Sequence, residues 1–377
     1  KWEIAEGLAI RGGWGITEKL PSYHILYPKQ EYRDIQTYGF SHGEQTSYIY
    51  YTQPYTVTYN PELRWQRNSN SEIGLDAEFR GMKMSLVGFY NVTKGPYNFL
   101  SVYEPYSYNI LQRPEGFTMP ADPQIKIDSQ TGMMYVRGDD NEYWTPMDVK
   151  VTDRTFAKSS KQNNGADIKR AGAELVVEFP EIAPIRTTVR LDASYTHTRY
   201  LNEQLSAYYQ NGWSHTSLPD RSYQYVGIYA NGGGATNHVA NGKITHNLDA
   251  NLTTITHIPQ ARLIITCRLE MSVLRRSRLL SMYNGNPYAF TVTDTGKTPT
   301  GEDIYAGKSY TAVYPVSYMD LDGNVHPFTE AEAADPAFAN LILKSANAYT
   351  FAQDGYGPYM SANLSITKEI GEHVSLS

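Results

Sequence analysis

The feature that most constrains this chain is a two-residue alternation of apolar and polar side chains that recurs along most of its length. From 187 to 198 every second residue is apolar, and 261–273 repeats the pattern with a single break at Ile264. The same alternation occurs at 72–80, 247–252 and 360–367. A period of two predicts β-strands that have one apolar face and one polar face. We therefore expect an all-β, antiparallel fold.

The connections between the predicted strands have two very different lengths. The strands are expected at 2–16, 69–80, 82–94, 166–179, 185–200, 243–258, 260–276 and 359–369, with a ninth beginning near His373. Short turns alternate with the connections 17–68, 95–165, 201–242 and 277–358, which are far longer than the usual few residues. Alternating tight turns and large loops are typical of outer-membrane barrels, whereas a soluble sandwich has no reason to keep its two rims unequal.

These connections predict an antiparallel transmembrane β-barrel with long extracellular loops, because a sheet exposed to lipid cannot leave an edge unpaired. The chain of 377 residues would otherwise suggest two soluble domains. It contains no continuous apolar run of about 18 residues, so we do not expect a transmembrane helix. Passive porins and soluble β-rich glycan-binding proteins share parts of this pattern and stay open as alternatives.

The net charge and the cysteine content exclude several classes of protein. A net charge of −6 argues against a nucleic-acid partner, because binding to phosphate backbones needs an excess of Lys and Arg. Cys267 is the single cysteine, so the chain has no internal disulfide and no cysteine-based zinc site.

Several motifs carry a family resemblance. Asn60-Pro61-Glu62-Leu63-Arg64 precedes a strand with Glu72, Gly74 and Asp76 in alternate positions, and the next strand ends in Phe89-Tyr90. This order resembles the barrel signature of TonB-dependent outer-membrane transporters, and Arg11-Gly12-Gly13-Trp14-Gly15 resembles the segment just upstream. The closing stretch 365–377 and the loop with Tyr318–Asn324 and a helix-like segment near Phe328–Leu343 resemble the SusC-like branch of Bacteroidota.

The resemblance implies that residues 1–377 are the C-terminal part of a TonB-dependent receptor barrel of roughly 22 strands. The plug domain and the final strand would be absent from this chain. The family is an importer of large nutrients in the outer membrane of Gram-negative bacteria and not an enzyme. Its implied partners are a SusD-like surface lipoprotein, the TonB complex acting through the missing N-terminal region, outer-membrane lipid, and an oligosaccharide or peptide ligand.

Aromatic residues in the long connections are the candidate ligand-binding residues, because flat rings stack on sugars and pack against peptides. They are Tyr143, Trp144, Tyr208, Tyr209 and Trp213. Packing between the loops is the alternative interpretation.

Charged residues on the alternating strands are expected to line the lumen wall. They are Arg190, Asp192, Asp249, Arg262, Arg268 and Glu270, with the carboxylates paired to the arginines. A glycosidase carboxylate pair is the disfavoured alternative. Arg275, Arg276 and Arg278, at the top of a strand, are expected to meet either solvent or lipopolysaccharide phosphates.

Asp320, Asp322 and Asn324 have the spacing of the start of a calcium loop, but no Glu follows at the expected offset. A polar turn is the favoured interpretation and bound calcium is the alternative. The histidines show no metal-ligand spacing, so we expect neither a metal site nor a cofactor.

Overall fold

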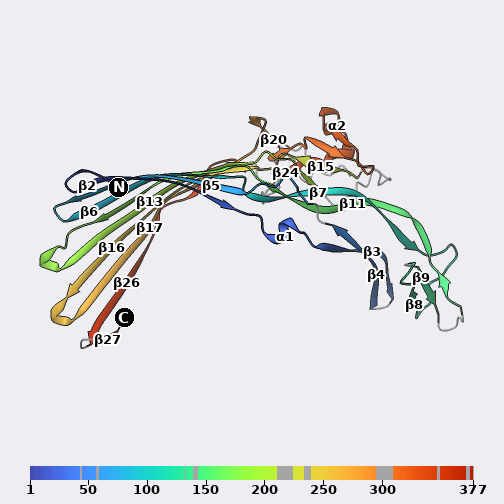
Figure 1. Cartoon of the computed structure of the whole chain (residues 1–377). Coiled ribbons are helices and arrows are strands. Elements are labelled where there is room, and N and C mark those ends of the chain that lie inside the picture. Colours follow the sequence, from blue (N-terminus) through green and yellow to red (C-terminus); the bar gives the residue numbers. More distant parts are fainter. Residues whose placement is uncertain are drawn as a thin grey trace.

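The computed structural model describes residues 1–42, 45–56, 59–131, 133–138, 143–209, 224–232, 239–293, 309–345, 349–370 and 374–376. The chain is mostly β, and its sheets are antiparallel. The largest sheet has 11 strands and fans out at one side of the molecule, while the long connections extend to the other side (Figure 1). No described helix has the length and apolar content that crossing a membrane requires.

Ten strands of this large sheet lie side by side in chain order. They are β1 (Trp2–Ala5), β2 (Leu8–Lys19), β5 (Gln66–Phe79), β6 (Met82–Lys94), β12 (Ile168–Glu178), β13 (Thr187–Leu201), β16 (Gly242–Ile258), β17 (Leu263–Leu280), β26 (Tyr359–Ile370) and β27 (Val374–Leu376). The eleventh strand, β25 (Asp354–Tyr356), also pairs with β17. From 69 onward, the predicted strands agree with these bounds to within a few residues.

The prediction of one continuous strand over 2–16 is wrong, because a hairpin divides this segment into β1 and β2. Gly7 adopts a left-handed φ of 72° in the turn, and its carbonyl accepts a hydrogen bond from the Glu78 amide at 2.6 Å. A Cβ at this position would lie 2.4 Å from the Glu78 carbonyl oxygen. Glycine is therefore required here by both the dihedral angle and the close approach.

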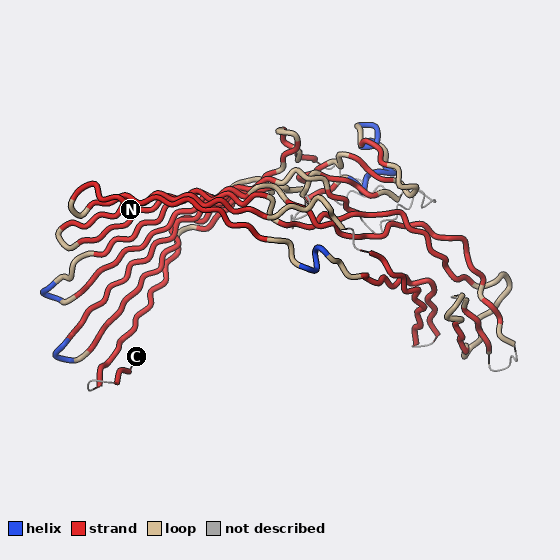
Figure 2. Tube along the Cα trace, viewed as in Figure 1, coloured by secondary structure: helices blue, strands red, loops and turns tan. Residues whose placement is uncertain are grey.

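The short connections of the large sheet all lie at one end of the strands (Figure 2). The β5–β6 turn uses Arg80 and Gly81, both with positive φ. The β12–β13 and β16–β17 turns each contain a 3₁₀ segment with a proline in its first positions, η1 (Ala183–Ile185) and η3 (Pro259–Ala261). Proline presets the φ of such a turn and donates no backbone hydrogen bond, so it stops the strand there.

The long connections contain short elements of their own, and together they are called the loop region (residues 20–65, 95–167, 202–241 and 281–353). The first connection holds α1 (Tyr23–Leu26), β3 (Gln30–His42) and β4 (Gln45–Thr56). The second is a long hairpin of β7 (Tyr97–Gln112) and β11 (Asp148–Asn164), with β8 (Gln124–Ile127), β9 (Met134–Arg137) and β10 (Thr145–Pro146) at its tip. The third holds β14 (Ser206–Tyr208) and β15 (Val226–Tyr229).

The fourth connection holds β18 (Met282–Tyr283), β19 (Asn286–Pro287), β20 (Phe290–Thr293), β21 (Ser309–Val313), β22 (Ser317–Met319), β23 (Val325–Pro327), α2 (Glu330–Ala334), η4 (Pro336–Leu341) and β24 (Leu343–Ser345). The helix-like segment predicted near Phe328–Leu343 is confirmed by α2 and η4. Thr329 and Glu332 form a capping box at the start of α2, which satisfies backbone amides that the short helix leaves unpaired.

The hydrophobic clusters of the described residues lie in the loop region and not on the large sheet. One cluster joins Leu111, Met134, Val136 and Met147 at the tip of the β7–β11 hairpin. A second joins Tyr229, Val239, Val313 and Leu343, and a third joins Tyr103, Phe156 and Val226. The last two clusters combine residues of different connections, and β15 also pairs with β22. The second, third and fourth connections therefore pack into one folded unit.

Candidate functional site

The strand register divides the large sheet into an apolar face and a polar face, because directly paired residues project from the same side. One row across the sheet consists of Leu75, Leu86, Leu175, Ala193, Ala250, Met271 and Met360. The next row projects to the other side and consists of Asp76, Ser85, Val176, Asp192, Asn251, Glu270 and Ser361. The predicted alternation thus places the apolar side chains on one face and most charges on the other.

Large side chains of the apolar face are exposed. Ile73 is 65% exposed, Leu364 is 66% exposed, and Leu86 and Tyr195 are also exposed. Among the described residues of the large sheet, the buried hydrophobic side chains are only Ala9 and Val177. A soluble sheet buries its apolar face against a second layer, so this face needs an apolar environment from outside the described chain.

The polar face carries ion pairs both within a single strand and between neighbouring strands. Arg190 contacts Asp192 at 2.8 Å and Glu178 at 3.1 Å. Arg268 contacts Glu270 at 3.1 Å. Four predicted wall residues, Arg190, Asp192, Arg268 and Glu270, therefore pair with one another as expected.

The other two predicted wall residues lie differently. Asp249 pairs with Arg275 at 2.9 Å and not with one of the arginines assigned to the wall. Arg262 lies in the turn between η3 and β17 with a left-handed φ of 50°, so its predicted position on a strand is wrong. The physical reason is Pro259, which begins a 3₁₀ segment and delays the start of β17 to Leu263.

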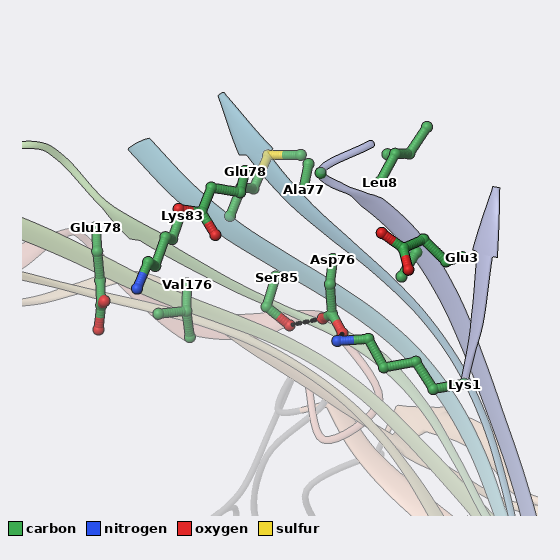
Figure 3. A pocket seen from close by; sticks show the side chains of 13 residues that line it. Lys1, Glu3, Leu8, Asp76, Ala77, Glu78, Lys83, Ser85, Val176 and Glu178 are labelled. Atoms are coloured by element: carbon green, nitrogen blue, oxygen red, sulfur yellow. Dashed lines mark hydrogen bonds and ion pairs between the residues drawn. The ribbon is translucent and has the colours of Figure 1, made fainter. Parts of the chain in front are cut away.

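A network around Asp76 was not foreseen from the sequence. The Asp76 Oδ1 accepts a hydrogen bond from the Ser85 hydroxyl at 3.0 Å, and its Oδ2 lies 3.3 Å from the Lys1 ammonium (Figure 3). Arg11 donates to the Ser85 hydroxyl at 3.1 Å and lies 3.6 Å from Asp76. Arg11 reaches this site by crossing Gly74, where a Cβ would lie 2.7 Å from its Nε.

This network explains the alternate motif residues Gly74 and Asp76 by their packing. Gly74 has no side chain at the point where the Arg11 side chain crosses its strand. The Asp76 carboxylate forms ion pairs with the cationic groups of Arg11 and Lys1. Phe89 packs on Gly172 in the same way, because a Cβ on Gly172 would lie 2.4 Å from the ring. Glycines within otherwise regular strands were the available signal, since they mark the close approach of another group.

Two hollows lie on the polar face. One has a volume of about 700 Å³ and surrounds the Asp76 network, with both Lys1 and Lys83 and several carboxylates in its lining (Figure 3). The other has a volume of about 1030 Å³ and is lined among others by Phe89, Asn91, Arg170 and Glu174. The second lining combines an aromatic ring with amide, cationic and anionic groups. Such a lining suits a polar ligand with many hydrogen-bonding groups.

The four predicted aromatic ligand residues that the structure describes are not brought together at one site. Tyr143 is 76% exposed beside β10, and the Arg137 guanidinium lies 4.8 Å from the Trp144 ring. Tyr208 lies in another sheet, the one formed by β14, β15, β22 and β23, and packs edge-on against Tyr229 of that same sheet, with ring centroids 6.5 Å apart. Figure 1 places β9 and β15 in separate parts of the loop region.

Tyr209 packs between loops. Its ring meets Phe156 at 5.2 Å, and its hydroxyl donates to Gln224 at 3.0 Å. Tyr208 and Tyr209 thus lie where the packing interpretation put them, whereas Tyr143 presents its face to solvent. Trp213 lies outside the described residues.

The Asp320–Asn324 segment forms a closed polar turn. The Asp320 Oδ1 accepts from the amides of Asp322 and Asn324 at 2.9 Å each, and its Oδ2 lies 2.8 Å from the His326 Nε2. Partial burial acts to raise the pKa of Asp320, but hydrogen bonds from His326, Asn324 and Asp322 outweigh it and lower the pKa to about 2. Asp322 faces Arg154 at 2.6 Å.

This geometry is that of the polar turn, because both carboxylates that a calcium ion would need are directed to other partners. Among the residues that the structure describes, no three His, Cys, Asp or Glu side chains are grouped as a metal site requires.

Comparison of the chain with protein-family models, curated proteins and solved structures gives no match. The function has to be inferred from the faces of the large sheet, the two hollows and the loop region.

Proposed function

We propose that this chain is part of the wall and loops of a transmembrane β-barrel that imports a large nutrient across the outer membrane of a Gram-negative bacterium. The exposed apolar face of the large sheet carries the proposal. By resemblance, the motifs around Asn60 to Asp76 support a TonB-dependent importer, and the stretch 365–377 with the loop around Tyr318–Asn324 supports its SusC-like branch. Such an importer takes energy from the TonB complex and works with a SusD-like lipoprotein.

Strand length and face chemistry support the membrane location. A transmembrane strand needs about 9–11 residues, and β5, β13, β16 and β17 have 14, 15, 17 and 18. Their apolar side chains face outward without a second protein layer, as lipid-facing strands require. In lipid an unpaired strand edge is costly, so the outer edges of β1 and β27, which pair with no other described strand, would have to be paired within a closed barrel.

The polar face supports a transport role. In a barrel of this kind the polar face lines the water-filled lumen. Its paired charges are solvated there, and no apolar surface is exposed to water. The hollow next to Phe89 offers ring, amide and charged groups to a passing polar oligomer. A glycan fits this lining, because an aromatic face and hydrogen-bonding groups are what sugar rings contact. An oligopeptide is the second ligand class.

The loop region supports capture of the ligand outside the membrane. Its clusters join three long connections into one unit at the loop end of the strands. A preformed unit costs less conformational entropy on binding than separate loops would. The loop region would cover one side of the bound ligand, and the surface lipoprotein would cover the other side.

Membrane location is tested by fractionating cells that express the full-length protein. We expect it in the outer-membrane fraction and expect extraction to require detergent. Recovery of folded, full-length protein from the detergent-free soluble fraction would contradict the proposal. It would favour a soluble β-rich glycan-binding protein.

A passive porin is the second candidate, because the polar face would serve it equally well. Uptake of a labelled oligosaccharide and a labelled oligopeptide should be measured in cells with and without TonB. We expect uptake of one of them to stop without TonB, whereas unchanged uptake would show a porin.

The same uptake measurement with the Tyr143→Ala variant tests whether the loop aromatics contribute to ligand capture. Tyr32→Ala is the control, since Tyr32 is similarly exposed in another connection.

A further inference from the structure

The apolar face of the large sheet carries basic residues at its loop end. Lys169 on β12 lies directly opposite Arg199 on β13, and Arg199 is linked through Ile244 to Arg278 on β17 in the same row. Arg276 lies one row nearer the short turns, opposite His246. Lys169, Arg199, Arg276 and Arg278 are all exposed and are called the basic cluster.

No carboxylate shares this face with the basic cluster. On β12, β13, β16 and β17, which are described in full, the register places no Asp or Glu on the apolar face. Three arginines of the polar face, Arg190, Arg268 and Arg275, each contact a carboxylate, whereas Arg170 on the same face forms no ion pair among the described residues. Among the described residues, no member of the basic cluster forms an ion pair.

The cross-strand positions bring like charges together. Lys169 and Arg199 are direct partners, and like charges in directly opposed positions destabilise a sheet. The ring centroids of His197 and His246 are 4.6 Å apart in the adjacent row. An anion seated between these side chains would remove the repulsion. Carboxylate and phosphate are the anions that guanidinium groups bind through paired N–H donors, and the register places no carboxylate of β12, β13, β16 or β17 on this face.

The position of the basic cluster identifies the source of the phosphate. Leu191, Leu252 and Leu269 continue the same face toward the short turns, whereas only the row with Leu201 and Leu280 follows on the loop side, so the cluster lies near the loop end of the apolar band. Tyr195 lies at this boundary and its hydroxyl is 2.9 Å from the His246 Nδ1. Aromatic residues occupy this level at membrane interfaces. Basic side chains just beyond it meet lipid headgroups and not a solute in the lumen.

We propose that the basic cluster binds the phosphate groups of a phosphorylated lipid in the leaflet on the loop side of the membrane. This inference rests on the proposed membrane location and adds a lipid site to it. Bound lipid would neutralise the paired charges and would hold β12, β13, β16 and β17 at a fixed depth.

The test compares two double variants of the full-length, detergent-purified protein. Arg276→Gln with Arg278→Gln removes two charges of the basic cluster from β17. The control, Arg268→Gln with Lys368→Gln, also removes two charges but none of the cluster, because Arg268 is on the polar face and Lys368 lies beside the short turns. Binding of a diphosphorylated glycolipid is measured by native mass spectrometry, with phosphatidylcholine as the zwitterionic reference.

We expect the cluster variant to bind the diphosphorylated glycolipid roughly 30-fold more weakly than the wild type, at about 1 kcal/mol for each arginine removed. The control should bind it as the wild type does, and phosphatidylcholine should not distinguish the three proteins. Equal affinity of wild type and cluster variant overturns the inference. Displacement of the glycolipid by millimolar inorganic phosphate overturns it too, because it would show a phosphate site without a lipid requirement.

A second variant, Lys169→Gln with Arg199→Gln, changes the other two members on β12 and β13. It should weaken glycolipid binding similarly, and an unchanged affinity contradicts the shared site even where the β17 variant folds poorly. Failure of the lipid site is distinguishable from failure of the proposed function. A protein that stays in the outer membrane without phosphate preference refutes only the lipid site, whereas a soluble protein refutes both.

Discussion

The large sheet and the loop region place their apolar side chains in opposite ways. On the large sheet, Ile73 and Leu364 are about two-thirds exposed, and most charges lie on the other face. In the loop region, Tyr229, Met134 and Val313 are completely buried in clusters. The loop region therefore has the internal cores of a water-soluble domain, and the large sheet does not.

This difference is the reason for our proposal that the two regions have different surroundings. Apolar burial stabilises a fold only where the alternative is contact with water. The loop region obtains that stabilisation from its own residues. The large sheet has to obtain it from an outside apolar phase, for which lipid is the proposal. The effect of a substitution on the free energy of unfolding should consequently depend on burial among protein side chains in the loop region and on the presence of lipid in the large sheet.

The largest effect is expected for Tyr229→Ala, which should destabilise the loop region by about 3–5 kcal/mol. It removes a ring packed against Tyr208 and a hydroxyl that donates to the Leu341 carbonyl at 2.6 Å. Burial raises the pKa of the Tyr229 phenol, so this donor stays protonated. Hydrogen exchange of β15 and β21 measures the loss. Tyr356→Ala should be nearly silent, because Tyr356 is 77% exposed.

If hydrogen-exchange protection were lost from the large sheet to the same extent, the two regions would unfold as one unit, which contradicts their separate stabilisation. Loss of protection confined to the loop region would show that the two regions unfold separately.

Leu364→Arg should destabilise the large sheet by about 2–4 kcal/mol in a lipid bilayer. Leu364 lies on the apolar face of β26, where lipid would have to solvate the introduced charge. Ser365→Arg is the matched control, since Ser365 is the next residue and projects from the polar face. Unfolding by denaturant in lipid vesicles gives both free energies. Equal, small effects of about 0.5 kcal/mol would indicate that water and not lipid covers the apolar face.

A smaller effect is expected from protonation of Asp320 in the loop region. Its pKa is lowered from 3.8 to about 2, so the ionised carboxylate stabilises the turn above about pH 4. This stabilisation should be lost as the pH falls through about 2, at a cost of about 1 kcal/mol. The amide NMR shifts of Asp322 and Asn324 report the titration. A midpoint near 4 would show that the hydrogen bonds to Asp320 are not formed.

Arg190→Gln should have the smallest effect, below about 1 kcal/mol, because its ion pairs with Asp192 and Glu178 are about half exposed. The effect should shrink further at high salt. Thermal unfolding at low and high salt measures it. A loss above 2 kcal/mol would mean that the polar face is dry, which contradicts a water-filled lumen.

Much of the large sheet could be predicted from the sequence because its physics is local. Alternation over 187–198 and 261–273 fixes which side chains share a face, and the prolines at Pro180, Pro184 and Pro259 mark the ends of strands. The hairpin between β1 and β2 was missed because apolar residues lie on both sides of Gly7 and continue the pattern. Arg262 was misplaced because the sequence does not show how many residues a turn consumes.

The candidate sites depended on contacts between residues far apart in the chain. The carboxylate partner of Arg275 is on the neighbouring strand, 26 residues away, and only the register with its bulge between Leu248 and Asp249 selects it. Likewise, Arg11 meets Ser85 across 74 residues of sequence. Nothing in the local pattern distinguishes Tyr209, which is packed between loops, from Tyr143, which is exposed.

An all-β chain with alternating strands, short turns and long connections follows from the amino-acid sequence, since side-chain periodicity and turn residues act over a few positions. The packed clusters of the connections and the pairing of Asp249 with Arg275 follow only from the three-dimensional arrangement. The same arrangement shows that, among the described residues, the four members of the basic cluster have no carboxylate partner. Strand pairing sets these distances, and the register depends on the whole sheet and not on any one segment.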